Sequence, residues 1–322
     1  VLSKWHVNEI VIGGTSPDFC KLPWTGEDPY SALVRKFNPS VKISNLGNEH
    51  HISHAAAAFY NSGFNKAIAL VVDGAGSYFF EQLDENGQRF AQGFETESVL
   101  VCEYPAKFGL LHKVIGNNHT IKLNNGILDF DDAITITKSY EAVSQYLGFG
   151  FIEAGKTMGL APYGKYDCSI PNLFLGNRGS KDVFIPNYPA GAFIDVQRHP
   201  YLQQENDPCV WHNDPEQLTD VEKNLAWKIQ NDTQNLVSNL IQKAIDETGI
   251  TNIVICGGYG LNCVANYFFA KKFPDVKFYF EPISNDGGTA IGLAKLIWHT
   301  MNGDMQIRPQ ENLYHGPQYD ID

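Results

Sequence analysis

The sequence has no uninterrupted hydrophobic run of about 18 residues, the minimum for a membrane-spanning helix, so no membrane partner is expected. It is also poor in basic residues. Lysines and arginines number 24 against 36 aspartates and glutamates, and the formal net charge is −12. Proteins that bind nucleic acids need a basic surface to hold the phosphates. The composition therefore argues against a nucleic-acid partner.

Cysteine is scarce, and the six cysteines include no Cys-x-x-Cys pair. No secretory signal pattern is visible at the start of the sequence. Scattered cysteines in a chain of this length are typical of a reducing compartment. These features predict a cytoplasmic protein.

Two familiar phosphate-binding motifs are also missing: the sequence contains neither a Walker A motif nor a Rossmann Gly-x-Gly-x-x-Gly fingerprint, which argues against NAD enzymes. Four other glycine-rich turns follow strands or border helices: Asp73–Ser77, Gly155–Gly159, Gly257–Asn262 and Asp286–Gly288. One such turn is more often a tight connection. Four of them favour a phosphate-containing ligand at the carboxyl ends of the strands.

The last third of the sequence has the clearest periodicity. Strands are predicted at 253–256 and 277–280, and helices at 263–272 and 289–299. Alternating strands and helices with short links predict a parallel sheet. A long amphipathic helix is predicted at 221–248, and Gly249 suits its end.

Earlier segments are predicted as strands and turns. Residues 67–72 read as a buried strand, and 78–83 as the next one, so that the turn 73–77 becomes the glycine-rich tip of a hairpin. Residues 88–94 are the predicted hairpin partner of 78–83. The glycines and proline of 155–164 predict an irregular segment.

Three histidines, His50, His51 and His54, open an alanine-rich helix. His50 and His54 are four residues apart, so both rings lie on one helix face and reach one ion. A plausible third ligand is Asp286, in the loop Ser284–Gly288. The alternatives are solvent-exposed or capping histidines, and a helix N-cap role for the aspartate.

Two further residues are candidates for a chemical role. Lys156 stands among glycines and could give a phosphate a point charge, or it could be a solvated loop lysine. Asp73 ends an apolar strand, where an ionised carboxylate needs a partner or an ion.

Five blocks of the sequence resemble the O-carbamoyltransferases of the NodU/CmcH family, and they occur in the family's order. They are His50–Phe64, Val72–Gly76, Gly155–Gly164, Gly257–Asn262 and Asn285–Gly288. The resemblance implies an α/β fold: a two-lobed, TsaD-like member of the actin/Hsp70/sugar-kinase superfamily, truncated in its first lobe.

The resemblance also implies roles for individual residues. A divalent metal, reported as iron in the family, is expected on His50, His54 and Asp286, with zinc or magnesium as alternatives. The bound nucleotide is ATP or carbamoyl-adenylate. Its phosphates are expected along Asp73, Gly74, Gly76, Gly155, Lys156 and Gly159, and its adenosine near Gly257, Gly258 and Asn262. Lys156 and Asp73 are the candidate catalytic residues.

The same resemblance suggests a domain layout. Residues 1–66 are expected to be the rest of the first lobe, including the metal-binding helix. Residues 67–300 are expected to form the nucleotide-binding lobe, with insertions at 113–138 and 165–220. Residues 301–322 are expected to be a linker toward a C-terminal YrdC-like domain, which in the family makes carbamoyl-adenylate from carbamoyl phosphate and ATP.

The predicted reaction transfers a carbamoyl group from carbamoyl-adenylate to a hydroxyl of a small, sugar-like molecule. The chain is expected to work with a YrdC-like domain or partner chain. Three alternatives remain: a threonylcarbamoyl transferase acting on tRNA, a sugar or acetate kinase, and a non-catalytic nucleotide-binding subunit that needs a partner chain. The histidine pair disfavours the kinase, because Mg²⁺ prefers oxygen ligands.

Overall fold

The computed structural model describes residues 7, 9–13, 28–47, 49–79, 82–83, 89–90, 93–124, 127–150, 152–176, 178–199 and 217–314. Several predicted segments fall partly outside these ranges. They are the predicted first lobe (residues 1–6, 8, 14–27 and 48), the predicted strands 78–83 and 88–94 (residues 80–81, 88 and 91–92), the first predicted insertion (residues 125–126), the second predicted insertion (residues 177 and 200–216) and the predicted linker (residues 315–322). Within the described residues, no helix is long and apolar enough to cross a bilayer.

A mixed sheet forms the centre of the molecule. Its strands are β3 (Lys66–Val72), β4 (Tyr78–Phe79), β7 (Gly93–Glu103), β8 (Lys107–Asn124), β9 (Ile127–Ala133), β14 (Asn252–Cys256) and β15 (Lys277–Phe280). The order across the sheet is β15-β14-β3-β7-β8-β9, with β4 also on β7. β14 runs parallel to β3 and β15, whereas β3, β7, β8 and β9 are antiparallel neighbours.

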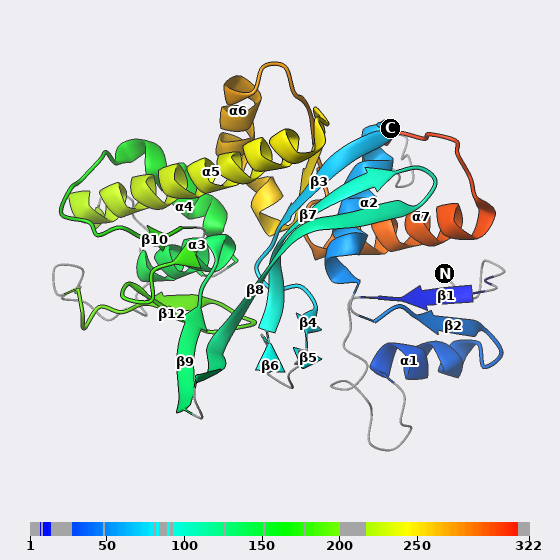
Figure 1. Cartoon of the computed structure of the whole chain (residues 1–322), viewed down its shortest axis with the longest axis horizontal. Helices are drawn as coiled ribbons and strands as arrows, with labels where there is room; N and C mark the ends of the chain where they lie inside the picture. The colour runs from blue at the N-terminus through cyan, green and yellow to red at the C-terminus, as the bar shows by residue number, and fades with distance from the viewer. Residues whose placement is uncertain are drawn as a thin grey trace, which may run out of the picture.

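Helices cover both faces of this sheet (Figure 1). They are α2 (His50–Ser62), α3 (Ile136–Tyr146), α4 (Ala154–Leu160), α5 (Asp220–Thr248), α6 (Cys263–Lys272) and α7 (Thr289–Asn302). Side chains alternate along β3, so one set packs with α3, α5 and α6 and the other with α2. Burial on both faces explains why β3 is apolar almost throughout.

The predicted elements of the last third are confirmed, including the parallel pairing of β14 with β15. The predicted helix 221–248 is also confirmed as α5. It begins with a capping box between Thr219 and Glu222, and it ends at Gly249, whose φ of 69° suits a glycine.

A small unit precedes the main sheet. It consists of β1 (Glu9–Ile12), α1 (Pro29–Phe37) and β2 (Lys42–Asn45), and the two strands pair in parallel. Asp28 caps α1 by accepting a hydrogen bond from the backbone N–H of Ser31 at 2.8 Å. In Figure 1 this unit lies beside α2 and α7.

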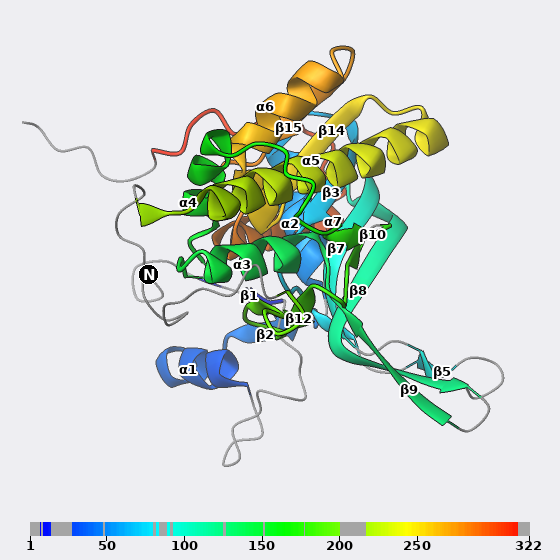
Figure 2. The ribbon, with the colours of Figure 1, turned by 90° about the vertical axis from the view of Figure 1, so that its left-hand side faces the viewer.

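The remaining elements are short. They comprise the strand pairs β5 (Gln82–Leu83) with β6 (Arg89–Phe90), β10 (Phe174–Leu175) with β11 (Arg178–Gly179), and β12 (Phe184–Pro186) with β13 (Ala192–Ile194), and the 3₁₀ helices η1 (Ala161–Tyr163), η4 (Gly258–Leu261) and η5 (Asp286–Gly288). Residues 113–138, the predicted first insertion, contain most of the β8–β9 hairpin and the start of α3. The hairpin extends away from the body of the molecule (Figure 2).

Two sequence predictions of local structure are wrong. Residues 155–164 are not irregular, because they lie almost wholly within α4 and η1. A Cβ at Gly155 or Gly159 would meet open space, so neither glycine marks a turn. The turn 73–77 is not a hairpin tip either. β3 and β4 follow one another along β7, and both pair with it in the antiparallel direction. The chain therefore does not reverse between them, and the segment that connects them runs along β7.

Helix α7 packs against α2 at Gly292. A Cβ at this position would lie 1.9 Å from the carbonyl oxygen of Ser53 and 2.6 Å from the backbone nitrogen of Ala57. Only a glycine allows the two backbones to approach this closely. The contact fixes the start of α7, and with it the loop that precedes the helix, relative to α2.

We therefore expect Gly292→Ala to destabilise the protein by about 1–3 kcal/mol, the usual cost of overpacking a close contact. Urea unfolding followed by circular dichroism measures the free energy of unfolding. Gly109→Ala is the matched control, because its Cβ would meet only the carbonyl oxygen of Val101 at 3.9 Å. Equal stabilities of the two variants would contradict the packing role of Gly292.

Candidate active site

The N-terminal turn of α2 presents the histidine pair. The ring centroids of His50 and His54 are 4.8 Å apart, and their Nε2 atoms are 3.1 Å apart. His54 is buried, and the side chain of His50 is 12% exposed. The four-residue spacing therefore brings both rings to one point, as the sequence predicts.

Two carboxylates reach the same point from other elements. Asp73 follows the end of β3 and is buried. Its Oδ1 accepts a hydrogen bond from the backbone N–H of Gly258 at 3.0 Å. Asp286 comes from the loop before α7. The N-cap alternative for Asp286 does not apply, because the side chain of Asn285 caps this turn by accepting from the N–H of Gly287.

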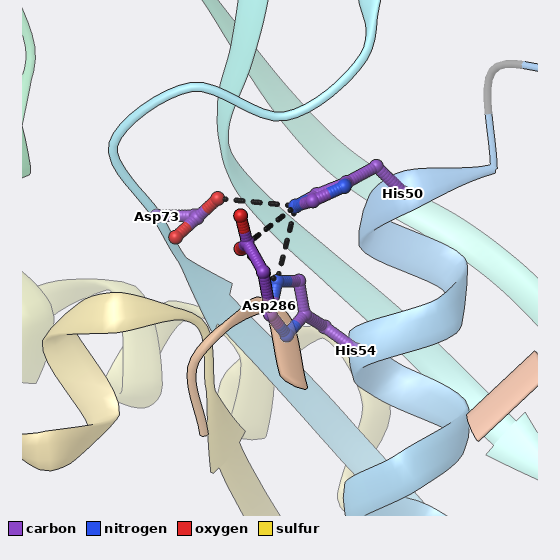
Figure 3. A group of neighbouring side chains, drawn as sticks. All are labelled: His50, His54, Asp73 and Asp286. Carbon is purple, nitrogen blue, oxygen red and sulfur yellow. Dashed lines mark hydrogen bonds and ion pairs between the residues drawn. The ribbon is translucent and has the colours of Figure 1, made fainter. Parts of the chain in front are cut away.

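The four side chains form a compact cluster (Figure 3). His50 Nε2 lies 3.4 Å from Asp73 Oδ2 and 3.4 Å from Asp286 Oδ1, and His54 Nε2 lies 3.5 Å from Asp286 Oδ1. One ligand atom from each residue lies within 4.8 Å of all the others. Residues more than 230 positions apart thus converge, and Asp73 joins the three predicted ligands.

The cluster is strongly coupled electrostatically. Burial opposes protonation of His50, but the carboxylates of Asp286 and Asp73 outweigh it and raise the pKa of His50 to about 10. Hydrogen bonds from His50 and His54 hold the pKa of Asp286 well below its usual range. The same is true of Asp73, whose burial is outweighed by the neighbouring imidazoles, so its pKa is also low. Without a metal, a proton on His50 holds the two acids together.

This donor set fits a transition metal. Two imidazole nitrogens and two carboxylate oxygens suit iron or zinc better than magnesium, which prefers oxygen ligands alone. The two carboxylates that raise the pKa of His50 would also stabilise a cation at this point. The ligand set that these residues would supply is therefore His50, His54, Asp73 and Asp286.

His51 lies outside the cluster. It is buried, its Nδ1 lies 2.8 Å from Ser98 Oγ, and burial lowers its pKa to about 4. Its ring centroid is 6.1 Å from that of His50 and 6.5 Å from that of His54. The neighbouring histidine therefore packs beneath the pair.

A cavity of about 900 Å³ adjoins the cluster. Three of the predicted glycine-rich segments and the Asp286 loop contribute to its wall, through Asp73, Gly74, Gly155, Gly258, Asn262, Asn285, Asp286 and Gly287. The volume matches that of small-molecule and cofactor sites. Four segments that are distant in the sequence therefore border one cavity.

Other predicted nucleotide residues do not line this cavity in the described part of the chain. Gly76 packs against other side chains, since a Cβ there would meet Glu95 and His51. Gly257 has a φ of 83°, and a Cβ there would meet the backbone of Val72. Gly159 is also outside the lining. Lys156 lies outside as well, with its ammonium 2.7 Å from Glu153 Oε1. The roles of these residues stay predictions.

Sequence reasoning missed a second lysine. Lys138, on α3, lines the cavity although it is 1% exposed. Its Nζ lies 2.6 Å from Glu141 Oε2 and 2.7 Å from the carbonyl oxygen of Pro189. A Cβ on Gly74 would be 2.8 Å from Glu141 Oε1 and 3.5 Å from Lys138 Nζ. Only the helical spacing of Lys138 and Glu141 could have suggested this pair.

Comparison with known proteins identifies the family of this chain. Residues 29–295 match the family model described as carbamoyltransferase N-terminus. The uncharacterized protein sll1178 of Synechocystis sp. is 29% identical over 284 residues, which cover 85% of this chain and 40% of that protein. Nodulation protein NolNO of Sinorhizobium fredii is 24% identical over 302 residues, or 90% of this chain and 37% of that protein. The chain thus spans about two fifths of the length of these relatives.

Among solved structures, T. kodakarensis HypF aligns with a TM-score of 0.50 at 13% identity, covering 86% of this chain and 39% of HypF. At this identity the likeness shows a shared fold alone. The predicted α/β fold class is confirmed. Because the family model covers most of the sequence, the chain belongs to the carbamoyltransferase family and corresponds to its N-terminal part.

Proposed function

We propose that this chain is the transferase part of an O-carbamoyltransferase, which moves a carbamoyl group from carbamoyl-adenylate to a hydroxyl of a small, sugar-like acceptor. The family membership supports carbamoyl transfer. One observation supports the proposed donor and acceptor chemistry. The cluster of two histidines and two aspartates lies beside a cavity whose wall includes several glycines. Carbamoyl phosphate and ATP would supply the donor through a YrdC-like domain or partner chain.

The residues that line the cavity support one orientation of the nucleotide. Gly74 follows Asp73 of the cluster, and a Cβ on Gly74 would lie 3.5 Å from Lys138 Nζ, so backbone amides and a cation that suit phosphate lie close to the cluster. Ile152, Met158 and Leu261 also line the cavity, and their apolar side chains suit a base. In the proposed complex, the phosphate of the donor therefore lies near Gly74 and Lys138, and its adenine contacts the apolar side chains.

The proposed step exchanges one acyl bond for another. The acceptor oxygen forms a bond with the carbamoyl carbon, the bond from that carbon to the AMP phosphate oxygen breaks, and the acceptor proton passes to a base. A metal held by His50, His54, Asp73 and Asp286 would supply a Lewis acid for the phosphoryl or carbonyl oxygen. Lys138 places a positive charge at the cavity wall, where the leaving phosphate gains charge.

This function predicts a metal-dependent transfer. Given carbamoyl phosphate, ATP, a YrdC-like protein and a panel of hydroxyl compounds, the wild-type chain should form a carbamate ester and release AMP. His54→Ala should strongly weaken both metal binding and transfer, because it removes one of only two imidazole ligands. Metal analysis and product detection by mass spectrometry measure the two effects.

His199→Ala is the control for His54→Ala, because His199 is a half-buried histidine whose Nε2 lies 2.7 Å from the carbonyl oxygen of Asp182, far from the cluster in sequence. A His54→Ala protein that keeps metal and transfer would refute the metal site. Carbamoylated tRNA in place of a small product would favour the threonylcarbamoyl alternative.

Metal binding should also depend on pH. The pKa of His50 is about 10 in the metal-free protein and 6.5 in an unperturbed chain, so its protonated form stabilises the fold below pH 6.5 and this contribution is lost as pH rises through 10. A metal must displace this proton. We expect its apparent affinity to rise ~10-fold per pH unit in this window, with one proton released per ion. Calorimetry in two buffers of different ionisation enthalpy counts the proton, and an affinity independent of pH would contradict this reading.

The two lysines can be compared directly. Lys138→Ala should lower transfer by ~10²-fold, a typical loss for one preorganised charge contact, and weaken AMP binding. Lys156→Ala should have a smaller effect, because the Lys156 side chain is 53% exposed and its ammonium is paired with Glu153. Steady-state transfer and AMP calorimetry on both variants test this order. The reverse order would support the sequence-based role of Lys156.

A further inference from the structure

Strand β7 carries three consecutive buried residues, Glu95, Thr96 and Glu97. In the pairing with β8, Glu95 stands opposite Ile115 and Glu97 opposite Val114, so Thr96 is the extra residue of a β-bulge. In a regular strand, two residues two positions apart share a face. The bulge breaks that alternation and sends the two carboxylates to different helices.

Glu95 reaches the N-terminus of α2. Its Oε1 accepts hydrogen bonds from the backbone N–H groups of His51 and Ser77, each at 3.1 Å, and its Oε2 accepts from the ammonium of Lys113. Glu49, the N-cap residue of α2, makes no side-chain capping bond. A strand residue therefore supplies the missing cap, and its charge suits the positive end of the helix.

Glu97 reaches the N-terminus of α3. Its Oε1 accepts from the backbone N–H of Ile136 at 3.0 Å, and its Oε2 accepts from the hydroxyl of Thr96 at 2.7 Å. Thr135, the N-cap residue of α3, makes no side-chain capping bond. The first turn of α3 is therefore also held by a carboxylate from β7.

These two helices carry the two halves of the site. α2 carries His50 and His54, whereas α3 carries Lys138 and Glu141 at the cavity wall. The bulge itself is tied to the site, because the backbone N–H of Asp73 donates to the carbonyl oxygen of Thr96 at 2.7 Å. One strand segment thus holds both helices and Asp73 in a fixed relation.

We propose that Glu95 and Glu97 are positioning residues: Glu95 sets the position of the histidine pair through α2, and Glu97 sets the cavity wall through α3. This inference rests on the proposed function, which makes α2 the metal-binding side and α3 the nucleotide-binding side. Residues that do not bind a metal themselves can hold its ligands in the right orientation. Metal ligands and binding residues must be fixed closely in position to act.

The test compares two equilibrium affinities of the intact chain, one for Co²⁺ and one for AMP, in two variants. Glu95→Ala should weaken Co²⁺ binding by ~10-fold or more, the usual cost of losing a partner of the ligands, and should weaken AMP binding without metal less than Glu97→Ala does. Glu97→Ala should weaken AMP binding by ~5-fold, as expected for the loss of one helix cap, and leave Co²⁺ binding unchanged. Absorption titration and calorimetry measure the two affinities.

Conservative variants guard against simple unfolding. Glu95→Gln and Glu97→Gln keep an amide oxygen that accepts the helix N–H, so each should restore most of the affected affinity. Glu103→Gln is the control, because this carboxylate lies on the same strand but pairs with Lys66 at the surface. It should change neither affinity.

The outcomes separate the two proposals. If the wild-type chain binds both ligands and the two alanine variants lose both affinities in parallel, the positioning roles are wrong and the proposed function stands. The same conclusion follows if neither variant changes either affinity. A wild-type chain that binds neither Co²⁺ nor AMP would overturn the proposed function and this inference with it.

Discussion

The contact between His50 and Asp73 connects the first turn of α2 to the end of β3, and the rest of the site depends on it. Asp73 can be buried as an anion because the imidazole and the N–H of Gly258 compensate its charge. Asp286 then meets both rings from the loop before α7, which Gly292 holds close to α2. Local backbone packing and charge compensation therefore place four ligand atoms together without a long loop.

Part of this arrangement could be predicted from local sequence. The four-residue spacing of His50 and His54 defines one helix face, so their convergence follows from helix geometry alone. The last third of the sheet is also predictable, because short apolar strands alternate with helices of the right period. Asp286 could be included because a glycine-rich loop before a helix is a common place for a ligand, and the structure brings it to the histidines.

Other features depend on tertiary structure and could not be predicted in this way. Asp73 becomes a fourth potential ligand only because β3 pairs with β14, whose following turn supplies the N–H of Gly258. Lys138 has no glycine beside it to suggest a phosphate site, and its position at the cavity follows from how α3 packs on the sheet. The glycines around Lys156 suggested an irregular loop, but they fit within α4 because nothing crowds them there. The bulge at Thr96 is equally hidden, because Glu-Thr-Glu reads as a regular alternation.

The charge of the site limits its chemistry. Two ionised carboxylates lie within a few ångströms of each other, and their field alone would repel an anionic nucleotide. The proton on His50 compensates part of this charge in the metal-free protein, and a divalent metal would compensate more. Lys138 cannot take over this role fully, because Glu141 and the carbonyl oxygen of Pro189 already engage its ammonium. Binding of a phosphorylated donor next to Asp73 is therefore stronger when a divalent metal occupies the cluster, which makes nucleotide and metal binding mutually reinforcing in the proposed mechanism.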